Sequence, residues 1–79
     1  MSNELPTIDK IRTGNKIKML MQQNHLTISQ LQLKLGMASA TNIYAWCRGE
    51  ITPGPDRLLH LANIFNCKIE DILMTSEEG

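Results

Sequence analysis

Apolar residues between positions 26 and 49 recur at the spacing of two short helices. In the first helix two leucines lie one turn apart, and in the second the apolar residues follow an i, i+3, i+4 pattern: Leu31 and Leu35, then Ile43, Trp46 and Cys47. The pattern predicts helices over residues 28–35 and 40–48, joined by a tight turn. Each is about two turns long, which is too short to be stable alone. Both must therefore pack against other elements.

The residues at the ends of these two segments are typical helix caps. Thr27 followed by Gln30 predicts a capping box at the start of the first helix. Gly36 stands where a left-handed residue ends a helix, and Ser39 is a good N-cap for the second helix. Gly49 is expected to end the second helix.

A longer amphipathic segment precedes this pair. Thr7, which follows Pro6, predicts a helix start, and the helix should reach residue 24. Its core face should use the following apolar residues: Ile17, Leu20 and Met21, with Ile8 and Ile11 extending the stripe. Gly14 costs about 1 kcal/mol relative to Ala inside a helix. Either the helix begins after Gly14, or another backbone packs closely there.

Two more helices are predicted after the loop GEITPGPD. Pro55 suits a first helical position, and the segment to residue 65 has one apolar face at helical spacing: Leu58, Leu61, Ala62 and Phe65. A last short helix is predicted over residues 69–74. The expected fold class is all-α with five short helices. It forms one domain over residues 7–74, between a flexible tail at 1–6 and an acidic, disordered tail at 75–79.

Composition agrees with a small single domain. The chain has 79 residues, of which 42% are hydrophobic, enough for a small core without metal or disulfide support. Cys47 and Cys67 form no CxxC pattern and are expected to be reduced thiols of a cytoplasmic protein. The start of the chain lacks the apolar segment of a signal peptide, and no apolar run is long enough to span a membrane.

The formal net charge is zero, which by itself argues against a nucleic-acid binder. The charges are unevenly distributed, however. The first 36 residues carry five Lys or Arg and two Asp or Glu. Residues 37–79 carry three Lys or Arg and six Asp or Glu. A weakly positive face is therefore expected, drawn mostly from the first helix.

The order and spacing of four segments resemble the Cro/phage-repressor (XRE-type) helix-turn-helix family across residues 13–74. These segments are GNKIKML, LTISQLQLKLG, NIYAWCRG and TPGPDRLLHLANIFNCKIEDIL. The resemblance implies a lambda-repressor-like fold whose second and third helices form the helix-turn-helix. It also implies a small repressor-type regulator that binds double-stranded DNA, with residues 40–48 in the major groove and a homodimer as a possible assembly.

The chain departs from the family pattern at three places. Many family members have an Arg and a Glu that form a partly buried ion pair where this chain has Met21 and Cys47. An apolar pair can replace such an ion pair at no loss of stability. The turn between Gly36 and Ile43 is one residue longer than in many members. Gln32 stands where many members have Ala, which predicts a different packing angle there.

The resemblance places candidate base-reading residues at the start and on the exposed face of the third helix: Ser39, Ala40, Thr41, Asn42, Tyr44 and Ala45. Asn suits the edge of adenine, and the alanines can contact only a thymine methyl. Candidate phosphate contacts are Thr27, Arg48 and Arg57. Glu50 opposes them, because its carboxylate repels phosphate.

A second class of function stays open at this point. The zero net charge, Glu50, and the exposed-looking Ile28 and Leu33 also suit a protein-interaction module with little DNA affinity, or an antitoxin. We find no nucleophile–base pair, no phosphate loop and no metal-ligand spacing. No enzyme activity, cofactor, metal, membrane association or small-molecule ligand is therefore expected.

Overall fold

The computed structural model describes residues 5–76 and contains five helices in this part of the chain. Their bounds are α1 Lys10–Gln23, α2 Ile28–Leu35, α3 Thr41–Arg48, α4 Pro55–Phe65 and α5 Ile69–Ile72. The predicted all-α class with five short helices is confirmed. The predictions for residues 1–4 and 77–79 lie outside the described residues.

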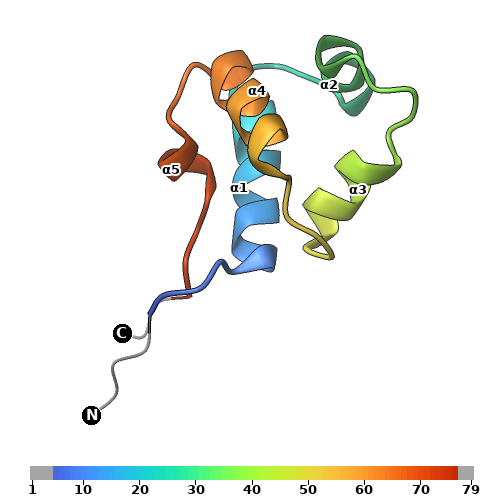
Figure 1. Ribbon diagram of the computed structural model, residues 1–79. Coiled ribbons are helices and arrows are strands. Elements are labelled where there is room, and N and C mark those ends of the chain that lie inside the picture. Colours follow the sequence, from blue (N-terminus) through green and yellow to red (C-terminus); the bar gives the residue numbers. More distant parts are fainter. Residues whose placement is uncertain (1–4, 77–79) are drawn as a thin grey trace.

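Helix α1 lies at the centre of the molecule, with α3 on one side and α5 on the other (Figure 1). Helix α4 packs against α2 and α5. The buried core draws on all five helices, and its fully buried members are Ile17, Leu31, Ile43, Leu61 and Ile72. Trp46 is also buried, so its indole ring is part of this core.

The N-cap of helix α1 lies two residues later than the sequence predicted. Its N-cap is Asp9, whose carboxylate accepts a hydrogen bond of 3.0 Å from the backbone N–H of Arg12. Thr7 lies before the helix in extended backbone, where its carbonyl accepts a 2.8 Å hydrogen bond from Ser76 N–H. Ile8 and Ile11 are exposed, so their predicted place on the core face is wrong.

Gly14 lies inside α1 because another backbone packs against it. A Cβ atom at this position would overlap the carbonyl oxygen of Trp46 and lie 3.0 Å from that of Cys47. Of the two alternatives that the sequence left open, close backbone approach is the correct one. Gly14 thus allows the end of α3 to contact α1 directly.

The two ends of the described chain are joined. Ile8 and Thr75 form an isolated antiparallel bridge, and Asp9 N–H donates to Met74 O at 2.8 Å. The buried Thr13 hydroxyl accepts from Met74 N–H at 3.0 Å. Helix α5 therefore ends at residue 72, and not at residue 74 as predicted, because the chain turns to extended backbone to make these bonds. The first two residues of the predicted acidic tail belong to this pairing.

The link between α2 and α3 spans residues 36–40. Gly36 adopts the left-handed conformation at φ 67°, as predicted, and the Gln32 side chain donates to Met37 O at 3.2 Å. The two helices share few close backbone contacts, because α2 rests mainly on α4 and α3 rests mainly on α1. The long link thus leaves room between α1, α2 and α3.

Candidate nucleic-acid interface

Helix α3 is anchored by its apolar side and ended by a glycine. Ile43 and Trp46 are buried, and Gly49 ends the helix at φ 79°, as predicted. The N-cap is Ala40, which has no side-chain cap. The Ser39 hydroxyl lies one residue further out and accepts only a 3.4 Å hydrogen bond from Thr41 N–H. Ser39 is therefore not the N-cap that the sequence predicted.

The outer side of α3 presents a small polar face. Thr41, Asn42 and Tyr44 are exposed, with Tyr44 at 49%. Ser39 is also exposed and lies within 3.3 Å of the Thr41 hydroxyl, while Ala40 is half-buried. Ala45 is only 8% exposed and faces the core, so its predicted place on the exposed face is wrong.

The N-terminus of α2 has the capping box that its sequence predicts. Gln30 N–H donates to the Thr27 hydroxyl at 3.1 Å, and Thr27 N–H donates to the Gln30 side chain at 2.9 Å. The Thr27 hydroxyl keeps its own hydrogen free to donate. An anion at this helix end would also meet the positive end of the helix dipole.

Arg48 at the end of α3 forms a two-point ion pair with Glu50. Its Nε atom lies 2.8 Å from Glu50 Oε2 and its Nη2 atom lies 3.1 Å from Oε1. The hydrogen bonds and the charge of Arg48 lower the pKa of the Glu50 carboxyl, and those of Glu50 raise the pKa of Arg48. Both side chains are about half exposed, at 55% and 56%.

Arg57 is engaged elsewhere. Its Nη1 atom donates to Leu35 O, the last carbonyl of α2, at 2.9 Å, and lies 3.5 Å from His60 Nδ1. The side chain is half-buried and caps the C-terminus of α2. The charged side chain of Arg57 is therefore satisfied within the protein, and Arg57 is not part of the candidate interface.

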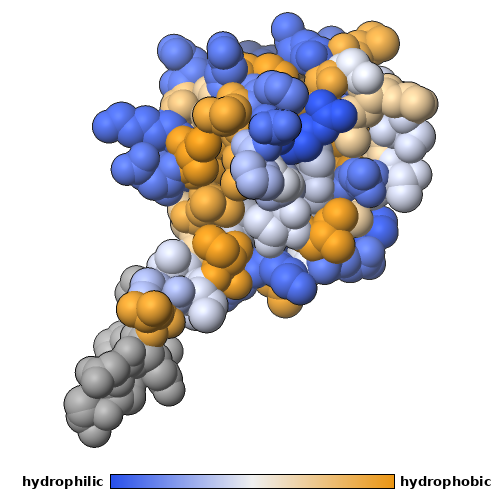
Figure 2. All heavy atoms as spheres, viewed as in Figure 1, coloured by the Kyte–Doolittle hydropathy of each residue, from blue (hydrophilic) through white to orange (hydrophobic). Residues whose placement is uncertain are grey.

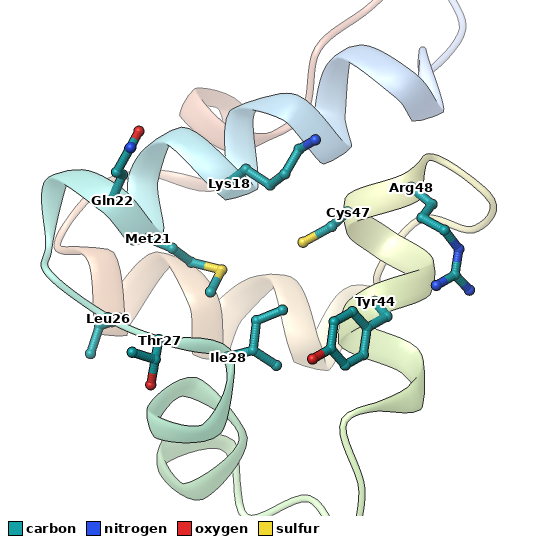
Figure 3. A pocket seen from close by; sticks show the side chains of 9 residues that line it. All are labelled: Lys18, Met21, Gln22, Leu26, Thr27, Ile28, Tyr44, Cys47 and Arg48. Atoms are coloured by element: carbon teal, nitrogen blue, oxygen red, sulfur yellow. The ribbon is translucent and has the colours of Figure 1, made fainter.

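A groove of about 640 Å³ lies between α1, α2 and α3 (Figure 3). It brings together residues that the chain spaces widely: Lys18, Met21, Gln22, Leu26, Thr27, Ile28, Tyr44, Cys47 and Arg48. The floor is apolar, and the sulfur atoms of Met21 and Cys47 are both directed into it. Ile28 is half-buried here and packs against the core, so it is less exposed than predicted.

Lys18 is the charged residue of this groove that the sequence did not single out as a candidate site residue. Helical periodicity places it on the polar side of α1, but only the tertiary arrangement sets it opposite α3. Burial raises the pKa of the Cys47 thiol, while the positive charges of Lys18 and Arg48 oppose that rise. The groove therefore combines apolar walls with two cations.

Other kinds of site are not visible in the described residues. Across residues 5–76, no group of three or more His, Cys, Asp and Glu side chains is placed to hold a metal ion. The same part of the chain contains no helix that is long and apolar enough to cross a membrane.

The family of the chain follows from its sequence. A family model, the Cro/C1-type helix-turn-helix DNA-binding domain, matches residues 16–78. The chain belongs to this family, and the predicted resemblance is confirmed. A search of curated proteins finds no significant match.

Solved structures share the fold at low sequence identity. The chain is similar to the restriction-modification controller protein C.AhdI from Aeromonas hydrophila, with a TM-score of 0.72 and 17% identity over 81% of this chain and 96% of that one. It is also similar to the DNA-binding domain of BldD from S. venezulae, with a TM-score of 0.70 and 19% identity over 84% of this chain and 97% of that one. At these identities the likeness establishes the fold.

Proposed function

We propose that this protein is a transcription regulator that recognises a specific double-stranded DNA sequence through α3. The observation that carries the proposal is the groove between α1, α2 and α3. It places the capped N-terminus of α2 beside the polar face of α3, with Lys18 and Arg48 at its edges. A major groove admits an α-helix, and a flanking helix N-terminus suits the adjacent phosphate. The family of the chain and the regulators that share its fold support the same function.

The residues divide into two roles. Thr41, Asn42 and Tyr44 are exposed and would contact base edges, with Ser39 and Ala40 at the entrance of the helix. The Asn42 amide suits adenine, which takes a donor and an acceptor from the same side chain. Thr27, Lys18 and Arg48 would bind phosphates. Because only Lys18 and Arg48 carry a charge, few counterions are released per copy and the affinity of one copy should be modest.

A second copy would supply the contacts that a single domain lacks. Dimers of helix-turn-helix proteins bind two half-sites one helical turn apart, about 34 Å. On the face shown in Figure 2, hydrophobic side chains gather on the side of the molecule that holds α5. Half-buried residues of this region include Ile69, Leu73 and Met74. We therefore propose Leu73 and Met74, which follow α5, as the dimer contact of a cytoplasmic regulator, rather than the exposed residues of α5 itself or the α2–α3 surface.

The experiment is selection from random duplexes. Labelled duplexes are bound at low salt, the bound fraction is separated and sequenced, and anisotropy gives the affinity for the selected site. Recovery of an inverted repeat with half-sites about one helical turn apart is the expected result. No enrichment with a folded protein, judged by Trp46 fluorescence, would refute specific recognition.

One variant pair tests base reading directly. Asn42→Ala should weaken binding to the selected site by about 10-fold, on the order of 1–3 kcal/mol, and relax the preference at one base pair. Asn63→Ala, on the exposed surface of α4, is the matched control and should leave affinity unchanged. Equal affinities of the two variants would exclude Asn42 from base recognition.

A protein-interaction module is the second candidate function, and one observation favours it. Leu33 is 79% exposed on α2, and Leu59 is 58% exposed on α4. An apolar surface of this kind can be buried by a protein partner. Such binding would change little with salt, whereas DNA binding weakens steeply.

A further inference from the structure

We propose that Glu50 competes with DNA phosphate for Arg48, so that DNA binding exchanges an internal ion pair for a phosphate contact. The inference rests on the proposed DNA binding and adds a residue, Glu50, that lowers the affinity for DNA. Both oxygens of the Glu50 carboxylate bind one edge of the guanidinium, Nε at 2.8 Å and Nη2 at 3.1 Å. Of the residues proposed to bind phosphate, Arg48 is thus the one whose side chain is already bound to a carboxylate.

Carboxylate and phosphate make the same two-point contact with a guanidinium. Each presents two oxygens to two parallel N–H groups, so the Nε–Nη2 edge holds one of them at a time. A phosphate on the remaining edge would lie beside the Glu50 carboxylate and be repelled by it. Full use of Arg48 by DNA therefore requires Glu50 to leave.

The turn after α3 holds the two side chains together. Gly49 N–H donates to Trp46 O at 3.1 Å and Glu50 N–H donates to Ala45 O at 3.0 Å, with Gly49 in the left-handed conformation. This pair of bonds fixes the backbone of Glu50 next to Arg48. The helix C-cap therefore places the two side chains within reach of each other.

The ion pair can be exchanged because it is exposed. Both side chains are about half accessible, and exposed pairs of this kind are weak and screened by salt. A phosphate carries the same charge and lies in the larger negative field of duplex DNA, so it is the stronger ligand at low salt. Glu50 reduces affinity without abolishing binding.

The test compares two substitutions that remove the same charge. Glu50→Gln should tighten binding to the selected site about 3–10-fold at 50 mM salt. It should also steepen the dependence of log affinity on log salt by up to about 0.9, because the wild type gains one phosphate contact but breaks one salt-screened ion pair, whereas the variant only gains the contact. Glu70→Gln removes an exposed carboxylate on α5, on the opposite side of α1 from α3, and should change affinity less than 2-fold with no change in slope.

A double-mutant cycle separates competition for Arg48 from general repulsion. In the Arg48→Gln background, Glu50→Gln should have no larger effect than Glu70→Gln. If Glu50→Gln tightens binding as much without Arg48 as with it, Glu50 acts by repulsion alone and the inference is wrong. Weaker binding by Glu50→Gln would also overturn it, because Glu50 would then be orienting Arg48 toward DNA.

The failure of the inference is distinguishable from that of the proposed function. Circular dichroism verifies that each variant is folded, which is expected because both side chains lie on the surface. If the wild-type protein binds no duplex at low salt, the proposed function fails and this inference fails with it. If the wild type binds and the Glu50 and Glu70 variants behave alike, only the inference fails.

Discussion

Gly14 shows how one hydrogen atom in place of a methyl group sets the distance between two helices. The carbonyls of Trp46 and Cys47 lie against its Cα, so the C-terminal end of α3 is held close to α1. The base-reading face proposed for α3 is on the other side of the same helix. The position of that face therefore depends on a residue that contacts no DNA.

Gly14→Ala should destabilise the protein although alanine is the better helix former. The gain in helix propensity is about 1 kcal/mol, but the added methyl group would overlap backbone that cannot move without shifting α3. We expect the free energy of unfolding to fall by about 2 kcal/mol, measured by urea titration of the Trp46 fluorescence.

Gly54→Ala is the matched control for this substitution. The Cβ atom it adds would meet nothing within 4 Å, and φ at Gly54 is −70°. Its cost should stay below about 1 kcal/mol, the loss of a preferred N-cap residue. Equal losses in the two variants would contradict the close contact between α1 and α3.

At the scale of the helices, features specified by neighbouring residues could be predicted from sequence. The capping box of Thr27 and Gln30 and the left-handed glycines at positions 36 and 49 are all present. Each depends on residues within one helical turn. The apolar faces of α3 and α4 were also predicted correctly, apart from Ala45.

Features that depend on distant parts of the chain could not be predicted. The start of α1 is set by hydrogen bonds to residues 74–76, so Thr7 was wrongly chosen as its cap. Arg57 is engaged by a carbonyl 22 residues earlier, and Lys18 joins the groove only through the packing of three helices. Tertiary contacts override local signals at these positions.

Arg57 should support the fold and contribute little to DNA binding. Arg57→Gln removes the charged hydrogen bond to Leu35 O at the C-terminus of α2, where a cation also interacts favourably with the helix dipole. We expect a loss of about 1 kcal/mol in the free energy of unfolding and an unchanged salt dependence of DNA binding.

Arg48→Gln should leave stability nearly unchanged and alter DNA binding, the opposite of Arg57→Gln. Its side chain is exposed, so stability should remain within about 0.5 kcal/mol while the salt dependence becomes shallower. If Arg57→Gln instead reduces the salt slope as Arg48→Gln does, Arg57 leaves Leu35 and binds phosphate in the complex.

For the molecule as a whole, the Cys47 thiol links stability to pH. Burial raises its pKa in the folded protein, so the unfolded chain loses this proton first as pH rises. The contribution of Cys47 to stability is therefore fully present below the ordinary thiol pKa of about 8.5 and declines above it. The decline continues until the pH passes the folded pKa.

The comparison that tests this link is Cys47→Ser, which has a similar size and no titration in this range. The difference in unfolding free energy between wild type and variant should narrow between pH 7 and pH 10, measured by urea titration at each pH. A constant difference over this range would show that Cys47 has the same pKa in both states.

The pairing of residues 7–9 with residues 74–76 has a consequence for how the protein is made. Asp9 and Met74 are hydrogen-bonded although nearly the whole described chain separates them, so this contact closes a very long loop. During synthesis, α1 leaves the ribosome before α5, and its N-terminal turn lacks these partners until residues 74–76 have emerged. Residues such as Ile17 and Leu31 can make their apolar contacts earlier. The buried Thr13 hydroxyl, in contrast, has no hydrogen bond from Met74 N–H until residue 74 has emerged. A nascent chain that has not yet released residues 74–76 would therefore present an α1 whose first turn stays open to proteases.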